Sequence, residues 1–173
     1  MTHQRARTAL VITASDGAAA RVREDASGAR VSARLEALGF SVERLVIADD
    51  REAIEAALVD GAARHPLVVT TGGTGLTPRD VTPQATQAVL DYEVPGLAEA
   101  MRAVGRATTP FADLSRAVVG VRGRSLIVNL PGSPNGALES IDAIAGVLEH
   151  AIDTLAGPYD HAITADGGQG KGG

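Results

Sequence analysis

The 173-residue sequence contains no cysteine, and its single lysine is Lys171. The absence of cysteine excludes disulfides, a thiol nucleophile and a thiolate metal site. A lysine confined to the glycine-rich end of the chain excludes a Walker-type phosphate loop and argues against Schiff-base chemistry. Covalent catalysis through a thiol or an amine is therefore not expected.

Aromatic residues make up 2% of the chain, and 21 acidic residues outnumber 16 basic ones, for a net charge of −5. The few aromatic side chains cannot form a platform on which nucleic-acid bases stack. The negative balance also lacks the basic stripe of a nucleic-acid surface. We therefore expect no nucleic-acid partner.

Long apolar runs are missing as well, and none approaches the roughly 20 residues that span a bilayer. Residues 1–7 (MTHQRAR) lack the apolar stretch of a signal peptide. The four histidines are scattered without H-x-x-x-H spacing, so no transition-metal site is expected. These features favour a cytoplasmic protein without membrane contact, with a single domain at 1–160 and a flexible glycine-rich tail at 161–173.

Short runs rich in β-branched residues alternate with segments of helical periodicity. The runs predict strands at 8–14, 41–48, 67–71, 117–121 and 125–130, with a loop at 15–25. The periodic segments predict a helix capped by Ser27 and ended by Gly39, one opened by Asp49 or Asp50, two near 83–92 and 95–104, and a long one through 138–155. This alternation predicts an α/β fold in three layers: a mostly parallel sheet with helices on both faces and a small antiparallel element.

Ligands of such sheets bind beyond the carboxyl ends of the strands, and the segment Gly72-Gly73-Thr74-Gly75 follows a predicted strand there. Successive backbone N–H groups of such a loop can form a nest for an anion, typically phosphate. The alternative is a tight turn from strand to helix. The glycines alone do not separate the two interpretations.

Asp80 lies five residues beyond Gly75. It can be part of a helix start, with Thr77 as cap, Pro78 in the first position and Asp80 reaching back. It can also be a carboxylate beside the phosphate nest that holds Mg²⁺.

Asp49 allows the same two interpretations, because Asp49-Asp50-Arg51-Glu52 is a credible capping box at the end of a predicted strand. If both Asp49 and Asp80 faced the nest, they would repel each other without a cation. A divalent ion that bridges them to a nucleotide triphosphate removes that conflict.

Two later segments offer further polar groups. Ser115 could donate to a phosphate or leaving group, with charge from Arg116, or simply form a turn hydrogen bond. The segment Asn129-Leu130-Pro131-Gly132-Ser133-Pro134 ends a predicted strand and could present a backbone edge to a base or a pterin ring. Ser133-Pro134 is equally an ordinary helix start.

Together these motifs resemble one family. The segments TTGGTGLTPRDVTP, EVPGLAEAMR, FADLSRAVVGVRG and LIVNLPGSPNGALE, in this order, are similar to the MogA/MoaB-type molybdopterin adenylyltransferases. The opening VITASDG and the following EDASG are similar to that family's first loop. The resemblance extends from about residue 8 to 155, and the GGTG–RDVTP and NLPG-P blocks are highly specific in combination.

The resemblance implies the reaction of molybdopterin with Mg-ATP to give adenylyl-molybdopterin and pyrophosphate. It implies catalytic roles for Asp49, Asp80 and Ser115, with Mg²⁺ on the two aspartates. It also implies a homotrimer and a downstream molybdate-insertion protein that receives the product. The expected substrate-binding residues are Ser15, Asp16, Gly72, Gly73, Thr74, Gly75, Asn129, Pro131, Gly132 and Ser133.

Some positions depart from the family pattern. Gly17 stands where an arginine is frequent, Gln84 where an acidic residue is frequent, and Ala48 where a proline is common. Three other functions stay open on the sequence: a non-catalytic molybdopterin-binding paralogue, an oligomeric scaffold domain, and a nucleotide or pterin pyrophosphatase.

Overall fold

The computed structural model describes residues 7–158 and contains one six-stranded sheet in the order β2-β1-β3-β6-β5-β4. The strands are β1 (Thr8–Ala14), β2 (Ser41–Ile47), β3 (Leu67–Thr71), β4 (Tyr92–Glu93), β5 (Val119–Arg122) and β6 (Ser125–Leu130). The helices are α1 (Asp16–Ala19), α2 (Ala26–Ala37), α3 (Arg51–Arg64), α4 (Thr82–Val89), α5 (Pro95–Thr108), the 3₁₀ helix η1 (Pro110–Leu114) and α6 (Pro134–Ala156).

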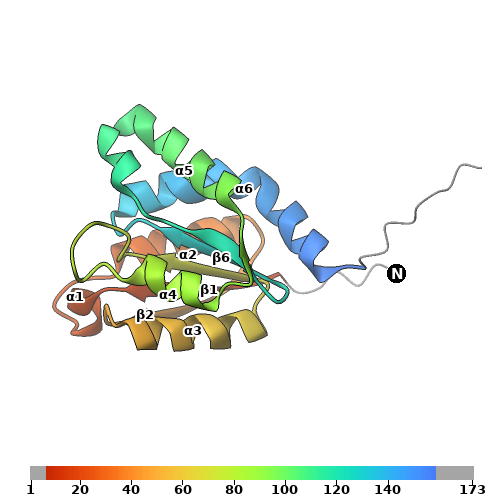
Figure 1. Cartoon of the computed structure of the whole chain (residues 1–173), viewed down its shortest axis with the longest axis horizontal. Coiled ribbons are helices and arrows are strands. Elements are labelled where there is room, and N and C mark those ends of the chain that lie inside the picture. The colour runs from red at the N-terminus through yellow and green to blue at the C-terminus, as the bar shows by residue number, and fades with distance from the viewer. Residues whose placement is uncertain (1–6, 159–173) are drawn as a thin grey trace, which may run out of the picture.

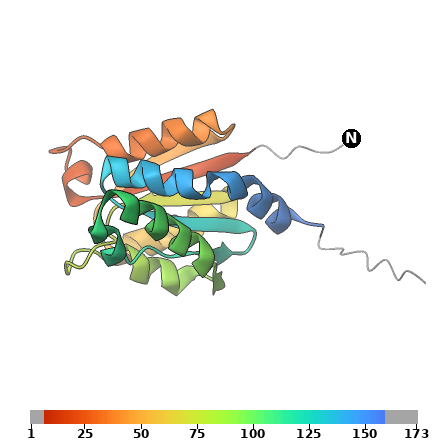
Figure 2. The same cartoon turned by 90° about the horizontal axis from the view of Figure 1, so that it is seen from above.

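Strands β2, β1, β3 and β6 run parallel, whereas β5 is antiparallel to both β6 and β4. Figures 1 and 2 show the sheet between two layers of helices. Within the described residues no helix is both long and apolar enough to cross a membrane. The predicted α/β fold, with its mostly parallel sheet and small antiparallel element, is confirmed.

The side chains of each strand alternate between the two faces of the sheet, and a hydrophobic core forms on each face. In β1, Ala9 and Val11 pack on the face covered by α2, α5 and α6, whereas Leu10 and Ile12 pack on the face covered by α3 and α4. Successive side chains of a strand point to opposite faces, so a strand buried on both faces must be apolar throughout. This is why the central strands appear in the sequence as continuous apolar runs.

Several boundaries differ from the sequence-based expectation. The loop at 15–25 contains the short helix α1, and Asp25, rather than Ser27, caps α2 by accepting from Gly28 N. Ser27 is instead buried, with its hydroxyl 3.1 Å from that of Thr71. The predicted strand at 117–121 begins at Val119, because residues before it belong to a loop that follows η1.

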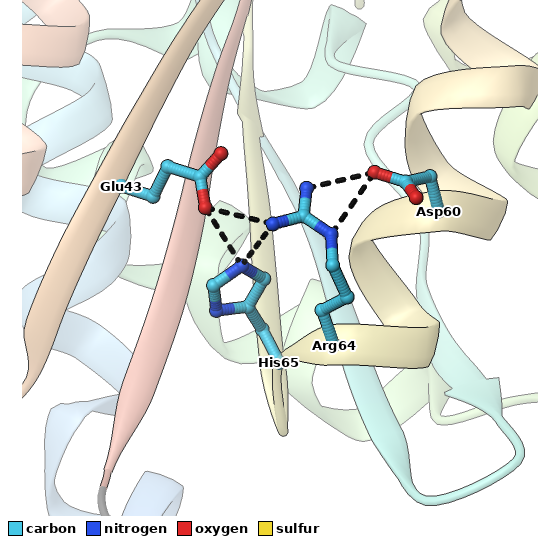
Figure 3. A network of polar contacts seen from close by, with 4 residues as sticks. All are labelled: Glu43, Asp60, Arg64 and His65. Atoms are coloured by element: carbon cyan, nitrogen blue, oxygen red, sulfur yellow. Dashed lines mark hydrogen bonds and ion pairs between the residues drawn. The ribbon is translucent and has the colours of Figure 1, made fainter.

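A four-residue polar network joins the end of α3 to β2 (Figure 3). Arg64 donates to Asp60 within α3 and to Glu43 on β2, and His65 Nε2 lies 3.2 Å from the same Glu43 carboxylate. The hydrogen bond and charge of Arg64 hold the pKa of Glu43 below its usual range. His65 precedes β3, so this network lies at its amino end, away from the loops that carry the candidate site.

The loops at the carboxyl ends of β1, β2, β3 and β6 meet at one edge of the sheet, because these strands are parallel. Asn129, near the end of β6, contributes to that edge from within. It is fully buried, its side-chain amide donates to the hydroxyls of Thr70 (3.0 Å) and Thr86 (2.9 Å), and its oxygen accepts from Val118 N (3.2 Å). Thr86 then donates to the carbonyl of Thr82, the first residue of α4.

We expect Asn129→Ala to lower the free energy of unfolding by about 2 kcal/mol, because it leaves the buried Thr70 hydroxyl and the Val118 N–H without a partner. Urea denaturation measures the change. Asn135→Ala is the matched control, since Asn135 is exposed and its side chain accepts, among residues 7–158, only from Arg30; its effect should stay within about 0.5 kcal/mol. Equal losses in the two variants would contradict the scaffold role of Asn129.

Candidate functional site

The glycine loop, residues 72–75, turns away from the end of β3 in a backbone conformation that suits glycine. Gly72 and Gly73 have φ angles of +90° and +66°. A Cβ at Gly72 would lie 2.4 Å from the Ala14 carbonyl oxygen, and one at Gly73 would lie 2.3 Å from the Thr82 hydroxyl. The loop is therefore pressed between β1 and α4, and it does not lead directly into a helix, because α4 begins only at Thr82.

The N–H groups of Gly73, Thr74 and Gly75 have no hydrogen-bond partner within residues 7–158, whereas that of Gly72 donates to the Leu130 carbonyl. Three successive unpaired N–H groups in a turn with left-handed residues can bind an anion. This supports the anion nest over the simple turn.

Asp49 is not the helix cap. Asp50 takes that role, since its side chain accepts from Ala53 N at 2.8 Å. Asp49 and Asp16 instead bind each other reciprocally: Asp49 Oδ2 accepts from Asp16 N, and Asp16 Oδ1 accepts from Asp49 N, both at 3.0 Å. The other Asp49 oxygen lies 3.3 Å from where a Cβ of Gly73 would be, so this carboxylate borders the glycine loop.

The Asp80 side chain reaches back to Thr77, as the helix-start interpretation expected, and its Oδ2 accepts from Thr77 N at 2.8 Å. The helix start that was one of the two interpretations is wrong, however, because residues 77–80 form a turn before α4. The Asp80 carboxylate lies 2.9 Å from where a Cβ of Gly75 would be. Asp49 and Asp80 therefore lie at opposite ends of the glycine loop, and both line one cavity.

The surroundings shift the pKa values of Asp49 and Asp16 in opposite directions. Burial raises the pKa of Asp49, and the charges of Asp16 and Asp80 raise it further, against a hydrogen bond from the Asp16 backbone and the charge of Arg79. The Arg79 guanidinium, which donates to Asp16 Oδ2 at 2.6 Å, and the Asp49 N–H hold the pKa of Asp16 below its usual range. Ionised Asp49 is therefore destabilised by its surroundings, and a bound cation would relieve this.

Two cavities meet at the glycine loop. The polar cavity, of about 560 Å³, is lined by Thr13, Ala14, Ser15, Ala18, Arg23, Glu24, Asp25, Ala26, Ser27, Asp49, Thr71, Gly72, Gly73, Asp80, Gly132, Ser133 and Pro134. The apolar cavity, of about 420 Å³, is lined by Gly73, Thr74, Gly75, Asp80, Ala98, Met101, Arg102, Gly105, Thr109, Phe111, Ala112, Leu114, Ser115, Ala117, Pro131, Gly132, Ser133, Gly136, Glu139 and Ser140. Gly73, Asp80, Gly132 and Ser133 line both.

Of the remaining predicted site residues, some line a cavity and others do not. Ser115 lines the apolar cavity, and its hydroxyl also accepts from Ala117 N at 3.3 Å. Ser15 lines the polar cavity and caps α1. Ser133 lines both cavities and caps α6, so it satisfies both interpretations. Asn129 lines neither cavity, and its amide group is already engaged in the scaffold described above.

Sequence reasoning missed one wall of each cavity. Thr13 and Thr71 lie near the carboxyl ends of β1 and β3, and this position is a signal that could have identified them. The α5 and η1 residues of the apolar cavity, such as Met101 and Phe111, carry no such signal. Their position depends on how α5 packs against α6, which is a tertiary feature.

The donor set suits a hard cation that also binds phosphate. No group of three or more His, Cys, Asp or Glu side chains gathers into a metal site anywhere in residues 7–158. Mg²⁺ is commonly held by only one or two carboxylates, with substrate phosphates and water completing its shell. Asp49 and Asp80, on either side of an anion nest, have the chemistry for such an ion.

We expect Asp49→Asn to raise the melting temperature of the ligand-free protein at pH 7. A folded-state pKa that is raised means that ionisation of Asp49 opposes folding. The stability this carboxyl contributes is complete below its unfolded pKa of about 3.9 and is lost as the pH rises through the folded value. The advantage of the variant should therefore disappear on acidification, as thermal unfolding at a series of pH values will show.

Asp16→Asn is the matched control, and its expected change in melting temperature has the opposite sign. Because the pKa of Asp16 is lowered in the folded protein, its stabilisation is present above the unfolded pKa and lost as the pH falls through the folded value. This variant should melt at a lower temperature than wild type at pH 7. Shifts of the same sign in both variants would refute the electrostatic account.

Comparison with known proteins identifies relatives over most of the chain. Residues 10–150 match the family model described as "probable molybdopterin binding domain". The molybdopterin adenylyltransferase of Helicobacter pylori (strain J99) is 39% identical over 149 residues, covering 82% of this chain and 84% of that protein. The molybdopterin adenylyltransferase of Haemophilus influenzae is 43% identical over 140 residues, covering 78% of this chain and 71% of that protein.

Solved structures show the same fold. The molybdopterin biosynthesis Mog protein from Mycobacterium ulcerans superposes with a TM-score of 0.83 at 46% identity, covering 87% of this chain and 99% of the other.

Proposed function

The chain belongs to the molybdopterin-binding domain family, and on that premise we propose that it is a molybdopterin adenylyltransferase, which transfers AMP from ATP to molybdopterin in molybdenum cofactor biosynthesis. The observation that carries the proposal is the convergence of Asp49 and Asp80 on an anion nest where two cavities meet. A transferase that joins two substrates needs two adjoining sites with the reacting phosphates at their junction.

The residues that line the two cavities support separate places for a planar ring and for the reacting phosphate. Met101, Phe111 and Leu114 make the wall of one cavity suitable for a planar ring. The glycine loop and Asp80 border both cavities, and the loop N–H groups are available to phosphate oxygens. We assign the transferring phosphate to this junction.

In the reaction, an oxygen of the terminal phosphate of molybdopterin attacks the α-phosphorus of ATP. A new P–O bond forms, the bond from the α-phosphorus to the bridging oxygen breaks, and pyrophosphate leaves with the bonding electrons. Such transfer depends mainly on positioning and on neutralising the charge of the phosphates. The N–H groups of residues 73–75 bind phosphate oxygens, and the Ser115 hydroxyl orients the acceptor at the apolar cavity.

Mg²⁺ is the cation that this proposal places on Asp49 and Asp80, where it would neutralise and align the ATP phosphates. The two aspartates would hold the ion, and Asp16 and Thr77 orient the aspartates through backbone N–H groups. Burial, together with the charges of Asp16 and Asp80, raises the pKa of Asp49 despite the charge of Arg79, so a cation bound there would stabilise the ionised carboxylate.

The proposal also covers the oligomeric state, the partner protein and the cellular location. By family resemblance it includes a homotrimer, a molybdate-insertion protein that takes up the product, and a cytoplasmic location. It also keeps residues 1–160 as a single domain, although the tail proposed at 161–173 lies outside the described residues.

We expect Asp80→Ala to reduce adenylylation by at least about 10²-fold, because it removes one of the two carboxylates that would hold the cation at the reacting phosphates. The product formed from ATP and molybdopterin is separated and quantified, with the circular dichroism spectrum recorded to check the fold. Asp142→Ala is the control, since Asp142 is exposed on α6 and pairs with Arg34.

The wild-type products decide between the functions. Adenylyl-molybdopterin supports the proposal, whereas binding without turnover identifies a non-catalytic paralogue and release of AMP identifies a pyrophosphatase. Turnover by Asp80→Ala close to the wild-type rate would remove Asp80 from the mechanism.

Ser115→Ala tests the hydroxyl separately. If Ser115 orients the acceptor, we expect kcat to fall by about 10-fold or more with little change in melting temperature, since its hydrogen bond to Ala117 N is long (3.3 Å) and only partly buried. Steady-state kinetics normalised to folded protein gives the comparison. A loss of melting temperature with unchanged kcat would mean that the hydroxyl only closes the turn.

A further inference from the structure

Arg116 forms three hydrogen bonds to the segment that carries the nest and Asp80. Its Nε donates to the Gly75 carbonyl at 2.8 Å and its second terminal nitrogen donates to the Asp80 carbonyl at 2.6 Å. Its backbone N–H donates to the Thr74 carbonyl at 3.0 Å. A residue 36 positions away in sequence therefore holds both ends of the turn that precedes α4.

The turn between these two carbonyls has hydrogen bonds of its own, from Thr77 N to the Asp80 carboxylate and from Asp80 N to the Thr77 carbonyl, but these do not connect it to β5 or α5. Residues 76–79 are exposed, and their side chains make one ion pair, between Arg79 and Asp16. An exposed turn of this kind pays a conformational entropy cost for each ordered residue. A planar guanidinium presents donors in a fixed fork, so bonds to two carbonyls set the distance between them.

Arg102 of α5 holds the other side of the junction. Its guanidinium donates to the carbonyls of Ser115 and Ala117, at 3.3 and 3.2 Å, which are the residues on either side of Arg116. The backbone around Ser115 is thus bound to α5, while the side chain of Arg116 extends from it to the Asp80 loop. Ser115 and Asp80, which line the same cavity, are connected through this one residue.

The charge of Arg116 is not used in an ion pair. No carboxylate within residues 7–158 pairs with it, and its side-chain partners are backbone carbonyls. A neutral side chain of similar length could fill the space, but it could not hold two carbonyls. The arrangement therefore serves geometry rather than charge pairing.

We propose that Arg116 is a positioning residue, which fixes the glycine loop and the Asp80 carboxylate relative to Ser115 for the transfer. This inference rests on the proposed function, because Asp80 and Ser115 are the groups that it positions. It assigns no contact between Arg116 and substrate.

Arg116→Met and Arg116→Lys test the proposal. Misplacement of reacting groups by about 1 Å can cost on the order of 10² in rate. We expect kcat to fall about 10²-fold in Arg116→Met, with a smaller change in KM for ATP, and Arg116→Lys to recover only a minor part, because one ammonium cannot reproduce the fork. Hydrogen exchange of the Thr77 and Asp80 amides, which are hydrogen-bonded within the turn, should be at least 10-fold faster in Arg116→Met without substrate.

Arg122→Met is the matched control. Arg122 is also half-buried and donates to a backbone carbonyl, that of Val89 at 2.7 Å, but it lies at the β5–β6 turn away from both cavities. This variant should keep kcat within about twofold of wild type, and its Thr77 and Asp80 amides should exchange as in wild type, even if its melting temperature falls.

The outcomes separate this inference from the function on which it rests. A wild-type protein that forms no adenylyl-molybdopterin would overturn the function, while the exchange rates would still decide whether Arg116 holds the loop. Full kcat in Arg116→Lys, unchanged exchange in Arg116→Met, or equal losses in Arg122→Met would each overturn the positioning role.

Discussion

Negative charge is crowded around the glycine loop, and the surrounding structure offsets it with dipoles and one cation. The carboxylates of Asp16 and Asp49 each accept from the other residue's backbone N–H, Asp80 accepts from Thr77 N, and Arg79 pairs with Asp16. Burial, with the charges of Asp16 and Asp80, outweighs these contacts and raises the pKa of Asp49, so its ionised form is kept at a cost in stability. A site that must bind a cation together with phosphates requires this kind of unpaired charge.

The sheet makes that crowding possible, because rigid strands determine where flexible loops end. Four parallel strands bring the relevant loops to a single edge, and Asn129 joins β6, β3 and α4 beneath them through buried hydrogen bonds. Above this layer, Arg116 holds the turn that carries Asp80. Precision at the surface therefore comes from polar contacts that are themselves partly or fully buried.

Several residues satisfy a structural and a functional interpretation together. Ser133 caps α6 and borders both cavities, and Asp80 closes a turn with the same carboxylate that borders the nest. A helix cap and a ligand site both need a polar group near unpaired N–H groups, so the two roles favour the same residue types. The likeness to proteins named molybdopterin adenylyltransferase adds weight to the functional role, which local geometry alone does not decide.

Periodicity and composition by themselves determined the α/β class, the central strands and the edge at which a ligand site had to lie, because these depend on local spacing and on the direction of parallel strands. They could not decide which of Asp49 and Asp50 caps α3, since a shift of one residue exchanges the roles. Nor could they identify Asn129 as scaffold, or Arg116 and the α5 wall as parts of the site. Those assignments depend on partners 13 to 59 positions away in the chain, which only the packed structure brings within hydrogen-bond distance.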